Sequence, residues 1–500
     1  MICFKGRWHH GLESSSICVI IFARIEDDFF IFEKGLCDMK TINRCLIQEI
    51  KGDTLTPISI LQKISGTKKF LLESSHKYND SGRYSFIGAD PAFELISRGE
   101  INEVIYRNGA KQVLNGNPLE VIKELLPAGV LDEYDFPFIG GAVGYVGYDI
   151  IREFEVIGEE YPNGLEMPDV HLMFFEEVIV FDHLQEKVKI CGLPLSDKSS
   201  VELIEKRVMQ IIEELKKPNY YHEEEPFTFR GFETETTKES FINSVDIAKE
   251  HILAGDIFQV VLSRRMKSSF QGTPLSLYRK HRSTNPTPYM FYIDFEEYTV
   301  IGSSPESLIK VRGNTVISNP IAGTKRRGAT TEEDERIGQE LVNDEKELAE
   351  HRMLVDLGRN DLGKVCEFGT VQIEKYLSVE KFRHVIHLVS EVSGKLNPEK
   401  TALDALAACL PAGTVSGAPK VRAMEIINAL EKSKRGLYSG AVGYLSVNGN
   451  MDFALAIRTM IIKDGEAIIQ AGAGIVYDSN PESEYEETLN KLRSFLEGEK

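Results

Sequence analysis

The sequence predicts a mixed α/β (α+β) protein in which two related antiparallel β-sheets pack face to face, with helices outside them. From about residue 55, short apolar stretches bounded by turn residues alternate with longer stretches of helical period. A hydrophobic fraction of 42% and a charged fraction of 27% are typical of a globular chain with a sizeable core. The pentapeptide Gly-Ala-Val-Gly-Tyr occurs at 141–145 and again at 440–444, and two related sheets would explain the repeat.

The N-terminal segment 1–38 is predicted to be a poorly ordered extension without a functional role. The apolar stretch 17–23 follows basic residues but is short and lacks a small-residue cleavage site, so it does not predict a signal peptide. No apolar run approaches the roughly 20 residues that a membrane helix needs.

Residues 39–217 are predicted to form an N-terminal half. The strands expected here span 69–74, 83–87, 93–98, 104–107, 170–174, 178–182 and 187–191, and the helices span 57–63, 118–125 and 199–217.

Residues 218–237 are polar, acidic and without period, and are therefore predicted to be a linker. The region 238–500 carries the chemical motifs. Helices are expected at 238–254, 275–283, 331–343, 344–357, 401–409, 419–431 and 482–496. The segment 255–265 is expected to be a turn that leads into a buried strand, and further strands are expected at 290–294, 299–303, 308–312, 441–447, 452–462 and 466–473.

Charge and cysteine content exclude several classes of protein. The net charge of −19 argues against general binding to nucleic acid or to an anionic membrane, so an anionic substrate would need a local cluster of basic residues. Seven cysteines without a Cys-x-x-Cys pair are typical of reduced thiols in a cytoplasmic protein.

Two pairs of glutamates have the same spacing. Glu347 and Glu350 lie three residues apart on a helix that Asp344 would cap, and Glu484 and Glu487 repeat the spacing near the C-terminus. Carboxylate pairs from two helices could converge on one Mg²⁺, which shares its ligand shell with anionic substrates. The alternative is a capping glutamate on an ordinary solvated helix face.

Glycine-bearing loops accompany these helices. Gly323 would let the backbone approach a ligand closely. The segment 411–420 enters a helix, and its Thr414, Ser416 and Lys420 could hold an anion there, although its glycines and prolines are equally consistent with simple punctuation. The glycines of 472–474 lack the following helix and the third glycine of a dinucleotide fingerprint, but their backbone N–H groups could meet a carboxylate.

Three further side chains are candidates for chemistry. Arg458 lies within the apolar stretch 452–462, so we expect it to be buried and paired with a carboxylate, either of the protein or of a ligand. His387 is either a satisfied core histidine or a base. Glu306 follows a short strand, and burial there would raise its pKa and suit it to general acid catalysis.

The sequence resembles the chorismate-utilising enzymes, and within that family the anthranilate synthase component I group. The resemblance rests on six segments that occur in this order: 255–265, 304–306, 320–324, 346–351, 411–420 and 484–491. The resemblance covers about residues 55–496 and implies that family's fold. It implies that Mg²⁺ is held by Glu347, Glu350, Glu484 and Glu487. It also implies catalytic roles for Glu306, His387 and Thr414, and chorismate binding by Gly323, Thr324, Tyr438, Arg458, Gly472, Ala473, Gly474 and Lys491.

Two positions separate the members of this family. Isochorismate and salicylate synthases carry a lysine where Gln259 stands, which activates water, so glutamine favours ammonia as the nucleophile. Aminodeoxychorismate synthases often carry a lysine in place of Ala322. The resemblance therefore favours anthranilate as the product, with an aminodeoxychorismate synthase component and a non-catalytic anion-sensing subunit as the alternatives.

The resemblance also implies regulation and a partner. Ser74, Pro288, Tyr289 and Met290 correspond to a pocket for tryptophan as an allosteric inhibitor. The sequence holds no Gly-x-Cys-x-Gly nucleophile turn. We therefore expect the ammonia to come from a separate glutamine amidotransferase subunit, and the chain to work in a hetero-oligomer.

Overall fold

The computed structural model describes residues 21–25, 28–32, 45–75, 82–126, 134–162, 164–196, 199–218, 225–381 and 385–496. The chain divides into a unit of residues 1–41 and a unit of residues 42–500. In the first unit, β1 (Ile21–Ile25) pairs with β2 (Asp28–Phe32) in antiparallel fashion. The other residues of the predicted extension 1–38, with Cys3, Cys18 and Cys37, lie outside the described residues. The second unit holds the two large sheets.

The first large sheet has 13 strands among the described residues. Its main path runs β13-β15-β27-β26-β17-β16-β4-β5-β11-β12-β3, and β14 and β23 add to β15. Its strands are β3 (Leu46–Lys51), β4 (Phe70–Glu73), β5 (Tyr84–Gly88), β11 (Glu177–Asp182), β12 (Lys187–Gly192), β13 (Thr228–Phe229), β14 (Glu233–Thr234), β15 (Gln259–Gln271), β16 (Tyr289–Asp294), β17 (Tyr298–Ser304), β23 (Gly417–Ala418), β26 (Thr459–Lys463) and β27 (Glu466–Ile475).

The second large sheet has 12 strands in the order β20-β22-β19-β18-β25-β24-β9-β10-β6-β7-β8, with β21 paired to β22. Its strands are β6 (Phe93–Arg98), β7 (Ile101–Tyr106), β8 (Lys111–Asn115), β9 (Gly141–Val146), β10 (Val170–Phe175), β18 (Ser307–Arg312), β19 (Thr315–Ser318), β20 (Ile321–Arg326), β21 (Gln372–Lys381), β22 (Val385–Lys395), β24 (Ala441–Ser446) and β25 (Met451–Leu455). Both sheets combine strands from before and after the segment 218–237.

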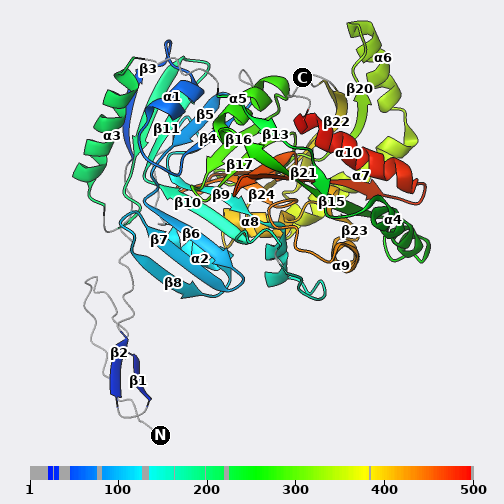
Figure 1. Ribbon diagram of the computed structural model, residues 1–500, viewed down its shortest axis with the longest axis horizontal. Coiled ribbons are helices and arrows are strands. Elements are labelled where there is room, and N and C mark those ends of the chain that lie inside the picture. The colour runs from blue at the N-terminus through cyan, green and yellow to red at the C-terminus, as the bar shows by residue number, and fades with distance from the viewer. Residues whose placement is uncertain are drawn as a thin grey trace. The chain divides into compact units, whose positions relative to one another are not determined.

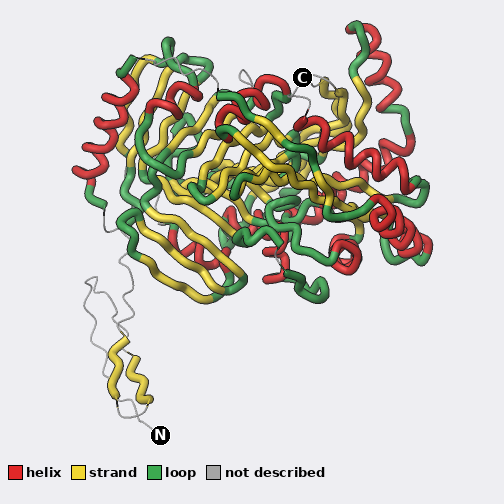
Figure 2. Tube along the Cα trace, viewed as in Figure 1, coloured by secondary structure: helices red, strands yellow, loops and turns green. Residues whose placement is uncertain are grey.

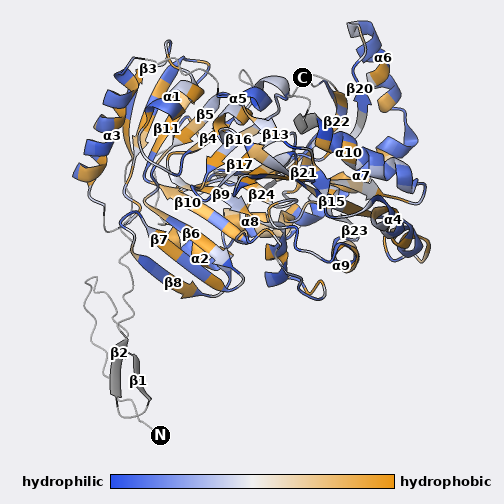
Figure 3. Cartoon of the chain, in the orientation of Figure 1, coloured by the Kyte–Doolittle hydropathy of each residue, from blue (hydrophilic) through white to orange (hydrophobic). Residues whose placement is uncertain are grey.

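The main hydrophobic core lies between the two sheets. It joins Phe291 and Val300 of the first sheet to Val143 and Phe453 of the second, and all four side chains are at most 2% exposed. Figure 2 shows the strands at the centre and helices around them, and Figure 3 shows apolar residues along the central strands. Because antiparallel sheets that bury one face against each other form a sandwich, the predicted fold class is confirmed.

Both copies of the repeated pentapeptide lie in one sheet. β9 and β24 are antiparallel neighbours, and Gly144 stands opposite Gly443. A Cβ at either glycine would lie about 2 Å from a carbonyl oxygen of the next strand, 2.1 Å from that of His171 and 2.0 Å from that of Asp452. The interpretation that each copy marks a separate sheet is therefore wrong: the repeat reflects two adjacent strands whose neighbours approach too closely for a side chain.

Helices cover the outer faces of the sandwich (Figure 1). They are α1 (Pro57–Lys63), α2 (Pro118–Leu125), α3 (Val201–Lys216), α4 (Lys238–Leu253), α5 (Pro274–Thr284), α6 (Thr331–Leu341), α7 (Glu345–Gly363), α8 (Ala402–Cys409), α9 (Lys420–Glu431) and α10 (Pro481–Leu496), with short 3₁₀ helices η1 (Tyr148–Glu153) and η2 (Gly413–Val415). The predicted cap of α7 is confirmed, because the Asp344 carboxylate accepts hydrogen bonds from the backbone N–H groups of Lys346 and Glu347. None of the described helices is long and apolar enough to cross a membrane.

The structure differs from the predicted elements in several places, of which three bear on the site and the linker. The stretch 452–462 is two strands, β25 and β26, because the chain turns between them and Arg458 adopts a φ of +48°. Residues 321–326 form strand β20 with a bulge between Ala322 and Thr324, where a loop was expected. Part of the expected linker forms β13 and β14, which pair with β15.

Candidate active site

Glu306 lies in the turn between β17 and β18, partly buried, where one strand of each sheet meets. Its Oε1 accepts a hydrogen bond of 2.7 Å from Oγ1 of Thr414, which η2 brings up from the other side of the site. Burial raises the pKa of Glu306 to about 7, and the Thr414 hydroxyl and the cations of Lys491 and Arg458 oppose that rise. A carboxyl group with this pKa can hold a proton near neutral pH and release it to a substrate.

Arg458 and Lys491 supply positive charge beside Glu306. The residue Arg458 retains exposed surface at the turn between β25 and β26, yet burial lowers the pKa of its guanidinium and the carboxylate of Glu306 opposes that fall. Lys491 of α10 donates to the carbonyl oxygen of Gly472 at 2.9 Å and forms an ion pair of 2.7 Å with Glu487. These two cations form a local cluster of positive charge in an otherwise acidic chain.

The glycines of 472–474 end strand β27 and pair with β15. A Cβ at residue 472 would lie 2.7 Å from the Tyr438 hydroxyl, and one at residue 474 would lie 2.7 Å from Nε2 of Gln259. Ala473 is fully buried and points to the opposite face of the strand. The glycines thus leave the space that two polar side chains occupy at the edge of the site.

His387 and Gly323 face each other across β22 and β20. Nδ1 of His387 lies 3.0 Å from the carbonyl oxygen of Gly323, an acceptor, so Nδ1 carries the proton. Burial lowers the pKa of His387, which favours the neutral ring and makes Nε2 the acceptor nitrogen. Thr324 follows in the same strand, and its side chain lies outside the described residues.

The four predicted metal ligands come from α7 and α10. Burial raises the pKa of Glu350, and the carboxylates of Glu347 and Glu487 raise it further. Burial likewise raises the pKa of Glu484, to which Glu487 again adds. Carboxylates from two helices therefore influence one another. Gly323 borders this group, because a Cβ there would lie 3.1 Å from Oε2 of Glu347.

This set of carboxylates fits Mg²⁺ in chemical kind, since hard divalent cations take carboxylate oxygens and relieve the repulsion between them. Within the described part of the chain, no three acidic, histidine or cysteine side chains are close enough together to hold an ion. The carboxylates are therefore neighbours rather than a closed coordination shell.

In the segment 411–420, two of the three polar side chains expected to hold an anion are bonded within the protein. Lys420 is bound to the buried Asp361 of α7 at 2.7 Å, and the Ser416 hydroxyl donates to the carbonyl oxygen of Ala412 at 2.7 Å. Of the three polar residues expected to hold an anion there, only Thr414 reaches the site, through Glu306.

The two segments predicted to bind tryptophan come together. β4 pairs with β16, so Met290 stands opposite Glu73, and the backbone N–H of Ser75 donates to the carbonyl oxygen of Thr287 at 2.9 Å. Ser74 and Met290 are buried, and Pro288 is partly buried. The hydroxyl of Tyr289 points instead toward the second sheet, where it donates to Asp452 at 3.0 Å.

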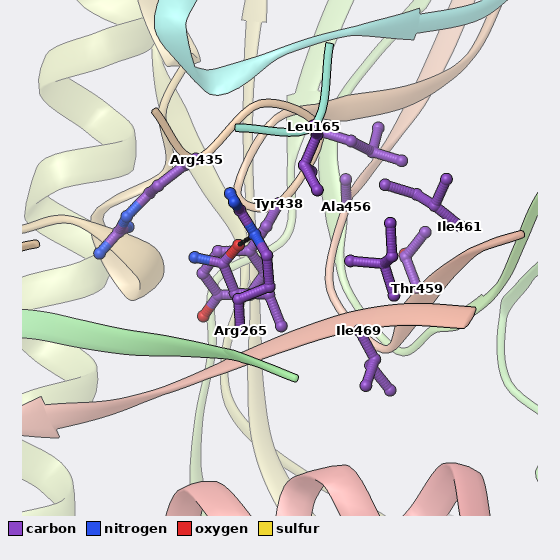
Figure 4. Close-up of a pocket in the computed structure, with 11 residues that line it drawn as sticks. Leu165, Arg265, Arg435, Tyr438, Ala456, Thr459, Ile461 and Ile469 are labelled. Carbon is purple, nitrogen blue, oxygen red and sulfur yellow. Dashed lines mark hydrogen bonds between the residues drawn. The ribbon is translucent and has the colours of Figure 1, made fainter. Parts of the chain in front are cut away.

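A small cavity of about 20 Å³ lies behind Tyr438 (Figure 4). Arg265 and Arg435 border it on one side and aliphatic side chains such as Ile461 and Ile469 on the other. The volume is about that of one water molecule, so the cavity is a packing space and not a substrate site.

Sequence reasoning missed one polar residue near the site, Arg264. It follows Ser263 in an apolar strand, and its neighbour Arg265 is also buried. Two adjacent arginines in a strand point to opposite faces, so at least one had to face the helices outside the sheet. That was the signal available in the sequence.

The chain is similar to known proteins over most of its length. Residues 68–497 match the family described as chorismate binding enzyme. The anthranilate synthase component 1 of Lactococcus lactis is 44% identical over 453 residues, which cover 90% of this chain and 98% of that protein. The component 1 protein of Aquifex aeolicus is 43% identical and covers 90% of this chain and 93% of its own length.

Solved structures agree with the sequence comparison. The crystal structure of anthranilate synthase component I from Streptococcus pneumoniae has a TM-score of 0.77 and 43% identity, over 89% of this chain and 98% of that one. The menaquinone-specific isochorismate synthase of Escherichia coli has a TM-score of 0.68, 20% identity and coverage of 91% and 95%, and so shares the fold. The chain belongs to the family of chorismate binding enzymes.

Proposed function

We propose that the chain is the synthase component of an anthranilate synthase: it converts chorismate and ammonia to anthranilate, pyruvate and water, the first committed step of tryptophan biosynthesis. The observation that carries the proposal is the Glu306–Thr414 pair. In this pair, the Glu306 carboxyl group has a pKa of about 7 and feels the positive charges of Lys491 and Arg458. The relatives at 43–44% identity are named for this reaction.

Glu306 acts as the general acid. Ammonia adds at C2 of the ring while the C4 hydroxyl leaves, and Glu306 gives its proton to that hydroxyl so that water departs. The Thr414 hydroxyl donates to Oε1, which holds the carboxyl group in one orientation and leaves its other oxygen to carry the proton. General acid catalysis of this kind contributes roughly a hundredfold to ten-thousandfold in rate.

The remaining side chains bind chorismate and remove its C2 proton. The guanidinium of Arg458 can take a carboxylate of chorismate in bidentate fashion, and Lys491 adds a second positive charge. His387, neutral and protonated on Nδ1, presents Nε2 as an acceptor beside the ring. Loss of the C2 proton with expulsion of pyruvate then produces the aromatic ring.

Mg²⁺ bound to the carboxylates of α7 and α10 would hold the ring carboxylate of chorismate and draw electron density from the ring. Glu347, Glu350, Glu484 and Glu487 are the residues that would hold it. Lys491, through its ion pair with Glu487, links this group to the backbone of Gly472.

Two features favour ammonia as the nucleophile. The side-chain amide of Gln259 lies beside Gly474, where a Cβ would be 2.7 Å from its Nε2, and Gln259 is 9% exposed. An amide cannot act as a base toward water. Ala322 is also buried and offers no nucleophile. We propose that a separate glutaminase subunit supplies the ammonia, and that tryptophan inhibits by binding where Ser74 meets the segment 288–290.

Substitution Glu306→Gln tests the proposal most simply. Glutamine keeps the shape and can still accept from Thr414, but it has no proton to give. We expect chorismate turnover with ammonium to fall at least a hundredfold while the far-ultraviolet circular dichroism spectrum is unchanged. Turnover within a few-fold of the unaltered chain would remove Glu306 from the mechanism.

A further inference from the structure

Arg264 of β15 is a buried arginine whose charge has no acidic partner among the described residues. Its side chain is 1% exposed, and neither terminal amino group, Nη1 or Nη2, has a hydrogen-bond partner in the described structure. Only Nε is bonded: it donates to Oγ1 of Thr488 on α10 at 3.0 Å. A buried guanidinium in this state is costly, because it has left water without an ion pair in exchange.

Aromatic rings are the main contacts that offset this cost. The guanidinium carbon lies 3.9 Å from the ring centre of Tyr485 on α10 and 5.5 Å from that of Phe241 on α4. Desolvated cation–π contacts are worth about 2 kcal/mol. The Thr488 hydroxyl, which accepts the bond from Arg264, in turn donates to the carbonyl oxygen of Tyr485 at 2.7 Å. Arg264 therefore binds one face of α10 at two successive turns.

That face is adjacent to the face that bears the proposed metal ligands. Tyr485, Thr488 and Leu492 follow the spacing i, i+3, i+7 and form the inward stripe of α10, on which Thr488 is fully buried and Leu492 is 2% exposed. Glu484, Glu487 and Lys491 have the same spacing one residue earlier, and so form a parallel stripe turned by about 100°. Fixing the rotation of the inward stripe fixes the direction in which the carboxylates point.

We propose that Arg264 is a positioning residue for the metal site: by stacking on Tyr485 and bonding Thr488, it sets the rotation of α10 about its axis and thereby aims Glu484 and Glu487 at Glu347 and Glu350. The proposal rests on the proposed function, because it assumes that these carboxylates bind Mg²⁺. Replacing a buried charge by a hydrophobic residue of similar size is often neutral or stabilising. Stability alone therefore does not explain an arginine at position 264, whereas a positioning role does.

The test is Arg264→Met, measured in two ways. Methionine fills a similar space without the charge, the planar stack or the Nε–H donor. We expect the thermal midpoint of the metal-free variant to be unchanged or higher, and calorimetric titration with MgCl₂ in the presence of chorismate to show about tenfold weaker binding, as loss of a group that orients metal ligands typically does. A purely structural arginine would give the opposite pattern, a lower midpoint with unchanged affinity for Mg²⁺.

Tyr485 provides the matched control. Tyr485→Phe keeps the ring under the guanidinium, so its Mg²⁺ affinity should remain within about twofold, whereas Tyr485→Leu removes the ring and should weaken Mg²⁺ binding as Arg264→Met does. Equal Mg²⁺ affinity in Arg264→Met and the unaltered chain would overturn the inference. If the unaltered chain itself binds no Mg²⁺, the metal assignment of the proposed function fails instead, and the two failures are thus distinguished.

Discussion

The carboxyl group of Glu306 combines burial with a single strong hydrogen bond, and each has a separate consequence. Burial keeps the group protonated to about pH 7, and the Thr414 hydroxyl determines which oxygen carries the proton. A carboxyl group in an aqueous loop would have lost its proton near pH 4.5 and could not serve as an acid at neutral pH.

Thr414→Val removes the hydroxyl and keeps the side-chain shape. We expect kcat for the ammonium reaction to fall about tenfold, because the Glu306 carboxyl group loses the donor that orients it. Thr414→Ser retains the donor and should stay within about threefold of the unaltered chain. If the valine and serine variants lose activity equally, the orienting role of the hydroxyl is wrong.

Stability should depend on pH through Glu306. Its pKa is raised in the folded chain from 4.5 to about 7, so between these values the folded state binds more protons than the unfolded state. This contribution is fully present below about pH 4.5 and is lost as the pH rises to about 7. Glu306→Gln should therefore be more stable than the unaltered chain at pH 8, but not at pH 4, in urea unfolding. An equal difference at both pH values would contradict the raised pKa.

At the scale of the element, the bulge of β20 holds Gly323 at a φ of +71° beside Glu347. Gly323→Ala adds both backbone strain and a Cβ that lies 3.1 Å from the carboxylate. We expect at least tenfold weaker activation by Mg²⁺. Gly313→Ala is the matched control: its φ is +56°, but a Cβ there would meet nothing within 4 Å. Equal effects of the two substitutions would show that strain alone matters.

The pairing of β4 with β16 brings together the two segments proposed to bind tryptophan. Ser74 is buried at the end of β4, and its neighbour Ser75 is partly buried and bonds Thr287 through its backbone. If the Ser74 hydroxyl contacts tryptophan, Ser74→Ala should raise the tryptophan concentration for half-inhibition about tenfold, the value of one hydrogen bond, without changing the uninhibited rate. Ser75→Ala should leave inhibition unchanged. Full activity of the unaltered chain at high tryptophan would end the regulatory proposal.

Elements with local signals were predictable from the sequence, and elements set by tertiary contacts were not. The spacing of glutamates and the Asp344 cap predicted α7 and α10, because helix periodicity and capping are local. The turn at Arg458 was missed, because apolar residues continue on both sides of it and only the sheet register shows that the chain changes sheets there. β21 and β22 were missed because the polar, exposed residues of β21 give no alternation.

At the scale of the whole molecule, the fold brings together residues that are far apart in the chain. Glu306, His387 and Lys491 come from three different elements, and the sequence alone could give their types but not their proximity. The adjacent arginines 264 and 265 indicate a buried charge, but only the structure identifies the partners of Arg264, Thr488 and Tyr485 of α10. The sequence therefore predicted the kinds of group in the site, and the structure supplied the contacts between them.

The source of nitrogen gives a prediction for the chain as a whole. Purified alone, it should produce anthranilate from ammonium but not from glutamine, since we propose that glutamine is hydrolysed by a separate subunit. Adding an anthranilate synthase glutaminase subunit should restore the use of glutamine. Glutamine-driven turnover by the single chain, measured as glutamate release coupled to anthranilate, would contradict the proposed partner.

The most direct test of the central claim is the product formed from chorismate. The purified chain is incubated with chorismate, MgCl₂ and an ammonium salt, and anthranilate is followed by its fluorescence and identified by mass. The proposed function predicts anthranilate and pyruvate in equal amounts, and no product after EDTA treatment until Mg²⁺ is restored. Consumption of chorismate without anthranilate would show an aminodeoxychorismate synthase component, and no consumption of chorismate under any of these conditions would contradict the enzymatic account.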